Sequence, residues 1–318
     1  MRSINSWLAA LSVGAFAFAA MALQPASAQA QDKVVRIGFQ KYGKLVLLKS
    51  KGSLEGKLKP LGYKVEWKEF PAGPQMLEAL NVGAIDFGNT GEAPPIFAQA
   101  AGAQLVYVAH EPPAPAGEAI LVAKDSPIKT VADLKGKKVA LNKGSNVHYL
   151  LVRALEKAGV KYSEIETAFL APADARAAFE RGSVHAWVIW DPFQAAAEAA
   201  TGARTLADGQ GLVANHQFYL GRRAFVEANT KALDVVLAEL SEVDDWAKRD
   251  IKAVSEQLSP SVGLPVPVLE VALKRQSYGI KPIDSTVIKE QQSIADTFFE
   301  LGLLPKKITI SDAVRAGS

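Results

Sequence analysis

The sequence predicts an α/β protein with mostly parallel strands and helices on both faces of its sheets. Short apolar runs typical of buried strands alternate with segments of helical periodicity from about residue 34 to residue 200. Such alternation indicates strand–helix–strand units. The 318 residues suggest about two domains, and 49% hydrophobic with 22% charged residues is ordinary for a globular protein.

The N-terminal segment is predicted to be a signal peptide rather than part of the fold. Trp7 to Leu23 is almost entirely apolar or small, Pro25 follows, and Ala26-Ser27-Ala28 is an A-x-A cleavage signal. The alternative is an uncleaved anchor, but the apolar run is short for a membrane span. We therefore expect cleavage before Gln29 and export.

Two sequence patterns predict the strands. Alternating runs are typical of half-buried strands, and continuous apolar runs are typical of buried ones. They cover residues 34–39, 64–69, 84–87, 105–109, 119–123, 139–141, 165–170, 186–190 and 217–220.

Helical periodicity, prolines and glycines predict the helices between these strands. A helix from Leu45 to about Leu58 follows the first strand. Pro74 suits a first helical turn and Gly83 a helix end. Further helices are predicted over 94–101, 130–136, 147–159 and 172–182 and from Asp191-Pro192, the 130–136 segment opening with a capping box.

Four predicted strands end in short polar loops that start helices. These loops are Gln40-Lys41, 88–92, 143–146 and Trp190-Asp191. Ligands of open α/β sheets bind at the carboxyl ends of the strands. A proline-rich connector over 110–117 separates the first two loops from the last two. If the halves are separate domains, all four loops face one cleft that can close by hinge motion.

Five ordered motifs give the chain a resemblance to a known family. FPAGPQMLEALNVGAID, TGEAPP, VADLKGKKVALNKGS, PADARAAF and IWDP look like the aliphatic-sulfonate-binding proteins of ABC importers. The resemblance covers essentially the whole mature chain. It implies a type II periplasmic-binding-protein fold, in which two α/β domains joined by two crossover segments surround a cleft. It also implies a periplasmic monomer that delivers its solute to a membrane permease.

Under that fold the chain divides into four parts. Residues 1–28 form the signal peptide and 29–118 the first part of domain I. Residues 119–216 form domain II, and 217–318 return to domain I. The sequence contains no cysteine, so we expect no lipid attachment, no disulfide and no thiolate metal site.

The chemistry of a sulfonate defines the expected site. A sulfonate is a permanent monoanion with three acceptor oxygens, and its burial is costly without hydrogen bonds. Helix N-termini favour anions, so Thr90, Gly91, Ser145 and Asn146 are expected to donate. These four, with Gln40 from the first loop and Trp190 as an apolar wall, are ligand-binding candidates.

Three further candidates carry open alternatives. Glu92 is awkward beside an anion and could cap a helix, orient Thr90 or meet an amine of the ligand. Asp191 raises the same problem, and a helix cap before Pro192 is its other reading. His148 is either a ligand donor or a satisfied structural histidine.

Other function classes find less support. The sequence has no G-x-S-x-G elbow and no G-x-x-x-x-G-K-[ST] phosphate loop, so no enzyme activity, cofactor or metal is expected. The net charge is +3, and +2 without residues 1–28, which is too mild for nucleic acid. Taurine, nitrate or a heteroaromatic precursor remain alternative solutes, and an extracytoplasmic enzyme or sensor is the rival class.

Overall fold

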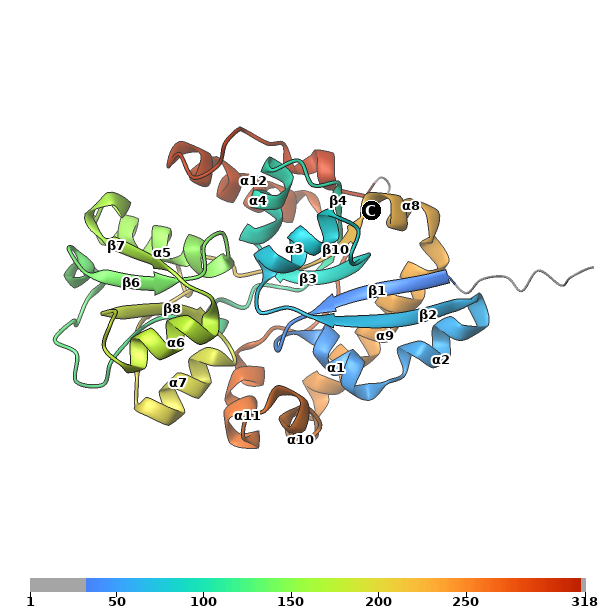
Figure 1. Cartoon of the computed structure of the whole chain (residues 1–318), viewed down its shortest axis with the longest axis horizontal. Helices are drawn as coiled ribbons and strands as arrows, with labels where there is room; N and C mark the ends of the chain where they lie inside the picture. The colour runs from blue at the N-terminus through green and yellow to red at the C-terminus, as the bar shows by residue number, and fades with distance from the viewer. Residues whose placement is uncertain (1–32, 316–318) are drawn as a thin grey trace, which may run out of the picture. The chain divides into compact units, whose positions relative to one another are not determined.

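Two five-stranded sheets organise the computed structural model, which describes residues 33–315 (Figure 1). The predicted signal peptide lies outside the described residues. We name the two halves lobe 1 and lobe 2 after their sheets. The sheet of lobe 1 has the order β2-β1-β3-β10-β4, and its strands are β1 (Lys33–Phe39), β2 (Tyr63–Glu69), β3 (Phe87–Gly91), β4 (Leu105–His110) and β10 (Gln217–Arg222). The sheet of lobe 2 has the order β7-β6-β8-β5-β9, and its strands are β5 (Glu118–Val122), β6 (Lys138–Leu141), β7 (Glu166–Phe169), β8 (Ala186–Trp190) and β9 (Arg204–Asp208).

Four of the five strands in each sheet run in one direction, which confirms the mostly parallel arrangement. β1 is parallel to β2 and β3, and β6 is parallel to β7 and β8. The exceptions are β10, antiparallel to β3 and β4, and β5, antiparallel to β8 and β9. Each exception is the strand by which the chain enters a sheet after crossing from the other lobe.

The helices follow the same division. Those that accompany lobe 1 are α1 (Lys44–Lys51), α2 (Leu54–Leu58), α3 (Gly73–Asn81), α4 (Ala93–Ala100), α8 (Arg223–Ala228), α9 (Thr230–Arg249), α10 (Ile251–Val262), α11 (Val266–Arg275) and α12 (Ser285–Glu300). Those of lobe 2 are α5 (Asn146–Lys157), α6 (Pro172–Glu180) and α7 (Phe193–Thr201). The predicted capping box of Thr130 and Asp133 is confirmed and opens the short 3-10 helix Val131–Leu134.

Two local predictions were wrong, and one strand was missed. The strand expected over 84–87 is instead β3, Phe87–Gly91, because the N–H groups of Ala84 and Ile85 close the end of α3 on Ala79. The residues expected as a polar loop thus pair with β10. The helix expected over 45–58 is divided into α1 and α2, since Gly52 adopts a left-handed conformation with φ of 67°. Strand β9 was not predicted, because its alternation is weak.

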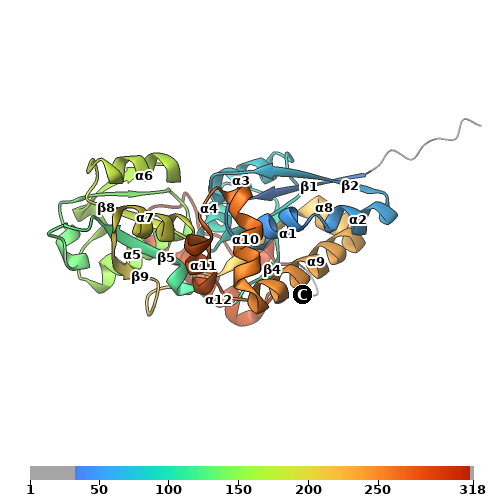
Figure 2. The same cartoon turned by 90° about the horizontal axis from the view of Figure 1, so that it is seen from below.

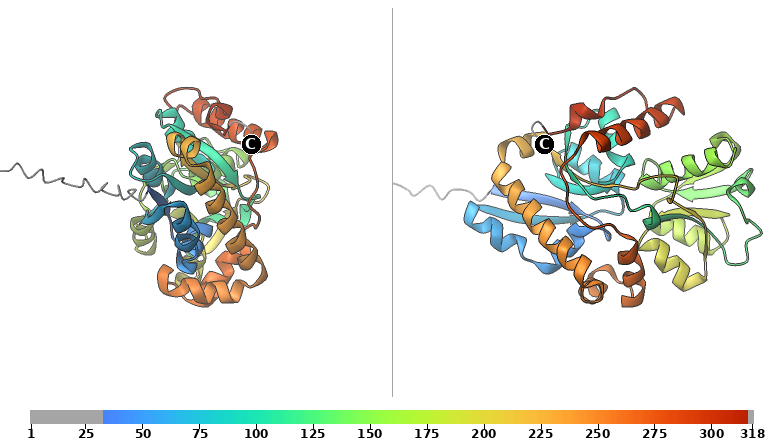
Figure 3. Two further views of the ribbon diagram at one scale, coloured as in Figure 1. Left: turned by 90° about the vertical axis from the view of Figure 1, so that its right-hand side faces the viewer. Right: turned by 180° about the vertical axis from the view of Figure 1, so that it is seen from behind.

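The C-terminal part of the chain returns to lobe 1 and also reaches lobe 2. Helices α9 and α10 pack on α1, and α12 packs on α4 (Figures 1 and 3). Helix α11 packs on α10 and touches α7 of lobe 2, as the view from below shows (Figure 2). Lobe 2 is therefore held by α11 as well as by the two chain crossings. No helix among residues 33–315 combines the length and apolarity needed to cross a membrane.

Candidate functional site

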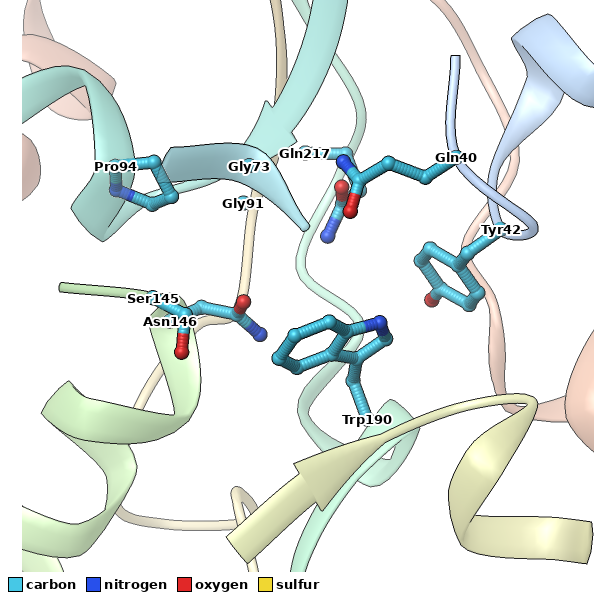
Figure 4. A pocket seen from close by; sticks show the side chains of 9 residues that line it. All are labelled: Gln40, Tyr42, Gly73, Gly91, Pro94, Ser145, Asn146, Trp190 and Gln217. Carbon is cyan, nitrogen blue, oxygen red and sulfur yellow. The ribbon is translucent and has the colours of Figure 1, made fainter. Parts of the chain in front are cut away.

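A small pocket lies between the two lobes at the carboxyl ends of their strands (Figure 4). Its free volume is about 10 Å³, which is the space of about one water molecule. Both lobes supply its walls, so the pocket depends on how they meet. The lining residues are Gln40, Tyr42, Gly73, Gly91, Pro94 and Gln217 from lobe 1 and Ser145, Asn146 and Trp190 from lobe 2.

Five of the nine predicted site residues therefore line one pocket. Gln40 follows β1, Gly91 ends β3, and Trp190 ends β8, while Ser145 and Asn146 begin α5. These positions agree with the rule that ligands bind at strand carboxyl ends. Their role in ligand binding stays a prediction.

The N-terminus of α5 presents backbone donors to the pocket. Ser145 precedes the helix, and the N–H groups of Asn146 and Val147 are in the first turn, where no intrahelical acceptor is available. Helix α4 on the opposite wall differs, because Pro94 and Pro95 in its first turn have no N–H. Helix α4 therefore lacks the first-turn donors that α5 supplies.

Three side chains of the pocket carry hydrogen-bonding groups that are not used within the described chain. These are the amide of Gln217, the hydroxyl of Tyr42 and the indole N–H of Trp190. In Figure 4 the indole ring of Trp190 lies between Asn146 and Tyr42, below Gln40 and Gln217. The free donors therefore come from both lobes and converge on one space.

The side-chain donors predicted from the sequence already make hydrogen bonds within the protein. The Gln40 amide donates to the carbonyl of Asn89 over 3.0 Å, which leaves one of its hydrogens free. The Ser145 hydroxyl donates to the carbonyl of Asn142 over 2.7 Å. The Asn146 amide donates to the carboxyl of Glu118 and, over 3.1 Å, to the side-chain oxygen of Asn215.

Thr90 lies beside the pocket without lining it. Its hydroxyl donates to the carbonyl of Gly91 over 3.0 Å, and its side chain packs so closely on Gly73 that a Cβ there would lie 3.0 Å away. Its contribution is to the fit between β3 and the start of α3.

Glu92 is a buried carboxyl behind the pocket. One oxygen accepts from the N–H of His216 over 3.1 Å, and the other has no partner among the described residues. Burial raises the pKa of Glu92 to about 8, although the N–H groups of His216 and Asn215 oppose the shift. Burial and the nearby Glu92 also raise the pKa of Glu118 well above its usual value. Glu92 is thus largely uncharged at neutral pH.

His148 faces an aromatic cluster instead of the pocket. Its Nδ1 accepts from the N–H of Gly144 over 3.3 Å, and its Nε2 lies 2.7 Å from the hydroxyl of Tyr162. Burial, with a smaller effect of Lys143, lowers the pKa of His148 to about 4. The ring is therefore neutral and joins α5 to Phe97 of α4 and Phe298 of α12.

Asp191 joins the two lobes. It accepts from the N–H of Ala195 in α7 over 3.0 Å and lies 3.5 Å from the guanidinium of Arg275 in α11. Arg275 also pairs with Glu198 over 2.7 Å. Burial raises the pKa of Asp191 to about 6, while the charge of Arg275 acts in the opposite direction. The bond to Ala195 agrees with the helix-cap reading. Asp191 does not line the pocket, and its role in ligand binding stays a prediction.

Sequence reasoning missed four residues of the lining. Tyr42 belongs to the loop after the first strand and Gly73 precedes the first proline of a helix, so both stood near residues already chosen. Pro94 has no hydrogen-bond donor, so nothing in the sequence indicated that it lines the pocket. Gln217 reaches the pocket only because β10 pairs antiparallel with β3, which brings it opposite Gly91. Residues 33–315 contain no group of three or more His, Asp or Glu side chains suited to a metal ion.

Three comparisons relate the chain to known proteins. The profile of the family described as NMT1/THI5 like matches residues 59–242. A relative from Escherichia coli (strain K12), named for binding aliphatic sulfonates, is 49% identical over 306 residues, which is 96% of this chain and 93% of the relative.

Two solved structures are similar throughout. The alkanesulfonate-binding protein SsuA from Xanthomonas axonopodis pv. citri, bound to MOPS, superposes with a TM-score of 0.85 at 43% identity, covering 90% of this chain and 99% of that chain. The periplasmic aliphatic sulphonate binding protein SsuA from Escherichia coli gives a TM-score of 0.81 at 49% identity, covering 90% and 93%.

Proposed function

The chain belongs to the NMT1/THI5-like family and, within it, to the aliphatic-sulfonate-binding proteins, and from this premise we propose that it binds aliphatic sulfonates as the solute receptor of an ABC importer. One observation carries the proposal: uncommitted donors from both lobes converge on one pocket at the strand ends. Such a pocket binds and encloses a solute without needing a nucleophile or metal.

The pocket suits the two parts of a sulfonate. Gln217, Tyr42 and the first turn of α5 supply donors for the three oxygens, and hydrogen bonds to a charged group contribute about 1.5–3 kcal/mol each. The indole of Trp190 offers an apolar face to the organic part. With about 10 Å³ free, the lobes must separate to admit the solute and close around it.

The same proposal covers the organisation of the precursor. Residues 1–28 are removed as a signal peptide, 29–118 and 217–318 form one domain, and 119–216 form the other. The mature monomer works in the periplasm and hands its solute to a membrane permease. The solute leaves unchanged, so no turnover is expected.

Titration calorimetry of the chain from Gln29 onward tests the proposal. Alkanesulfonates of increasing length, taurine, nitrate and sulfate esters form the panel. We expect 1:1 binding of alkanesulfonates and recovery of unaltered ligand. Gln217→Leu is expected to weaken binding about 10- to 100-fold, because one hydrogen bond to the charge is lost.

Gln257→Leu is the matched control, since Gln257 is exposed on α10 and donates to Ser50 away from the pocket. Equal affinity of both variants would remove Gln217 from the site. Binding of another solute in place of every sulfonate would overturn the proposed function.

A further inference from the structure

The pocket offers hydrogen-bond donors suited to an anion, but no charged side chain lines it. Its nine lining residues are glycines, one proline, three amides, one serine, one tyrosine and one tryptophan. All polar groups among them are neutral. An anion here meets only dipoles: amide, hydroxyl and indole donors and the N-terminus of α5.

The lysines next to the site residues in the sequence are held elsewhere. The ammonium group of Lys41 donates to the carbonyl of Val262 over 3.3 Å. That of Lys143 lies 5.4 Å from the centre of the Phe169 ring. Neither residue lines the pocket, although each adjoins a loop that does.

The nearby cations, buried Lys44 and partly buried Arg275, are paired with carboxylates. Lys44, which starts α1, lies 3.0 Å from Glu111 and 3.4 Å from Asp244. Arg275 lies between Asp191 and Glu198, as described above. Each positive charge therefore has negative partners within 3.5 Å, and little of its field remains for a ligand.

We infer that this pocket selects anions that carry a single negative charge and rejects doubly charged anions of the same shape. The inference rests on the proposed function only in that a sulfonate is the expected monoanion. The cost of removing an ion from water grows with the square of its charge, whereas its attraction to fixed dipoles grows only in proportion to the charge. Neutral donors can compensate one charge and fall short for two.

A phosphonate provides the sharpest comparison, because its group is also tetrahedral with three oxygens but gains a second charge near neutral pH, as a phosphate ester does. We choose three probes that each carry an ethyl group and differ in the anionic group. They are ethanesulfonate, ethylphosphonate and the monomethyl ester of ethylphosphonate. The ester keeps one charge throughout. Calorimetry is run roughly two pH units above and below the second pKa of the phosphonate.

Above that pKa we expect the dianion to bind about 100-fold more weakly than the monoester, since a buried charge is left without compensation. Below it, the two should bind alike. Ethanesulfonate at both pH values corrects for titration of the protein itself. Equal binding of the dianion and the monoester above the pKa would overturn the inference.

A lysine placed in the pocket should relax the selection. Gln217→Lys adds a cation at a side chain with no hydrogen bond within the described chain. We expect the dianion to gain at least about tenfold relative to the monoester, while Gln257→Lys on the surface changes nothing. Gln40→Lys repeats the test should Gln217→Lys fail to fold, and an unchanged ratio in a folded pocket variant would count against the inference.

The outcomes separate this inference from the proposed function. If sulfonate binds and the phosphonate dianion binds equally well, the function stands and the charge selection is wrong. If sulfonate does not bind but the monoester still exceeds the dianion, the function is wrong and the selection stands. Absence of binding by all three probes overturns both.

Discussion

Gly91 and Asn146 meet across the pocket so closely that no further atom fits between them. A Cβ on Gly91 would lie 2.8 Å from Cγ and 2.9 Å from Oδ1 of Asn146. Gly91 ends β3 in lobe 1, and Asn146 begins α5 in lobe 2. Asn146 cannot retreat without losing its bonds to Glu118 and Asn215. Glycine at this position therefore permits the approach of the lobes.

Gly91→Ala should keep the lobes from closing fully. Overpacking costs about 1–3 kcal/mol, and because only the closed form carries this cost, we expect sulfonate affinity to fall about 10- to 100-fold. Calorimetry measures the affinity, and small-angle X-ray scattering measures the closure. Gly56→Ala on α2, where no atom lies within 4 Å of the added Cβ, is the control. Unaltered affinity and closure in Gly91→Ala would contradict this account.

Arg275→Met should destabilise the protein more than removal of a surface ion pair. It leaves Asp191 buried without its cation, and breaking a buried pair costs about 3–5 kcal/mol. Since the side chain of Arg275 is 24% exposed, we expect the lower end of that range. Urea unfolding provides the measurement. Arg176→Met is the control, because its i,i+4 pair with Glu180 is exposed and is worth about 0.3–0.5 kcal/mol.

The partner variant completes this test. If Asp191→Asn is combined with Arg275→Met, the loss should be smaller than the sum of the two single losses, because the uncompensated charge is gone. Additive losses would mean that the two residues act independently.

Glu92→Gln should flatten the pH dependence of stability. The pKa of Glu92 is about 8 in the folded protein, above its ordinary value of 4.5, so between these values the folded state holds a proton that the unfolded state has released. Wild-type stability therefore falls as pH rises from 4.5 towards 8, by at most about 1.4 kcal/mol per pH unit from this group. Glutamine has no such proton to lose.

Urea unfolding of both proteins at several pH values measures the difference. The stability of Glu92→Gln relative to wild type should rise with pH across this window and stay constant below it, where the carboxyl is protonated in both states. A difference that stays constant with pH would show that Glu92 is ionised in the folded protein.

Trp190→Phe should remove most of the fluorescence change caused by ligand. Trp190 lines the pocket, whereas Trp67, Trp187 and Trp246 do not. Loss of the indole donor should also weaken sulfonate binding about tenfold. Trp246→Phe, beside α1 on lobe 1, is the control and should keep both the change and the affinity. An undiminished change in Trp190→Phe would place the ligand elsewhere.

Much of the fold could be predicted because its signals are local. The apolar face of α5, with Val147, Leu150, Leu151 and Leu155, is buried as its spacing predicted. The strand ends that carry Gln40 and Trp190 also followed from local patterns. Local signals failed at β3, because Gly88, Asn89 and Thr90 look like loop residues and pair as a strand only between β1 and β10.

The residue types and helix starts available for an anion can be read from the amino-acid sequence, and its motifs identified the family. The tertiary structure determines which donors are free. The hydroxyls of Ser145 and Thr90 donate to backbone carbonyls, while Gln217, far along the chain, enters the pocket by antiparallel pairing. It likewise decided the charge of Glu92, whose pKa is raised by burial. Hydrogen-bond partners and desolvation arise from segments distant in sequence, so no local pattern contains them.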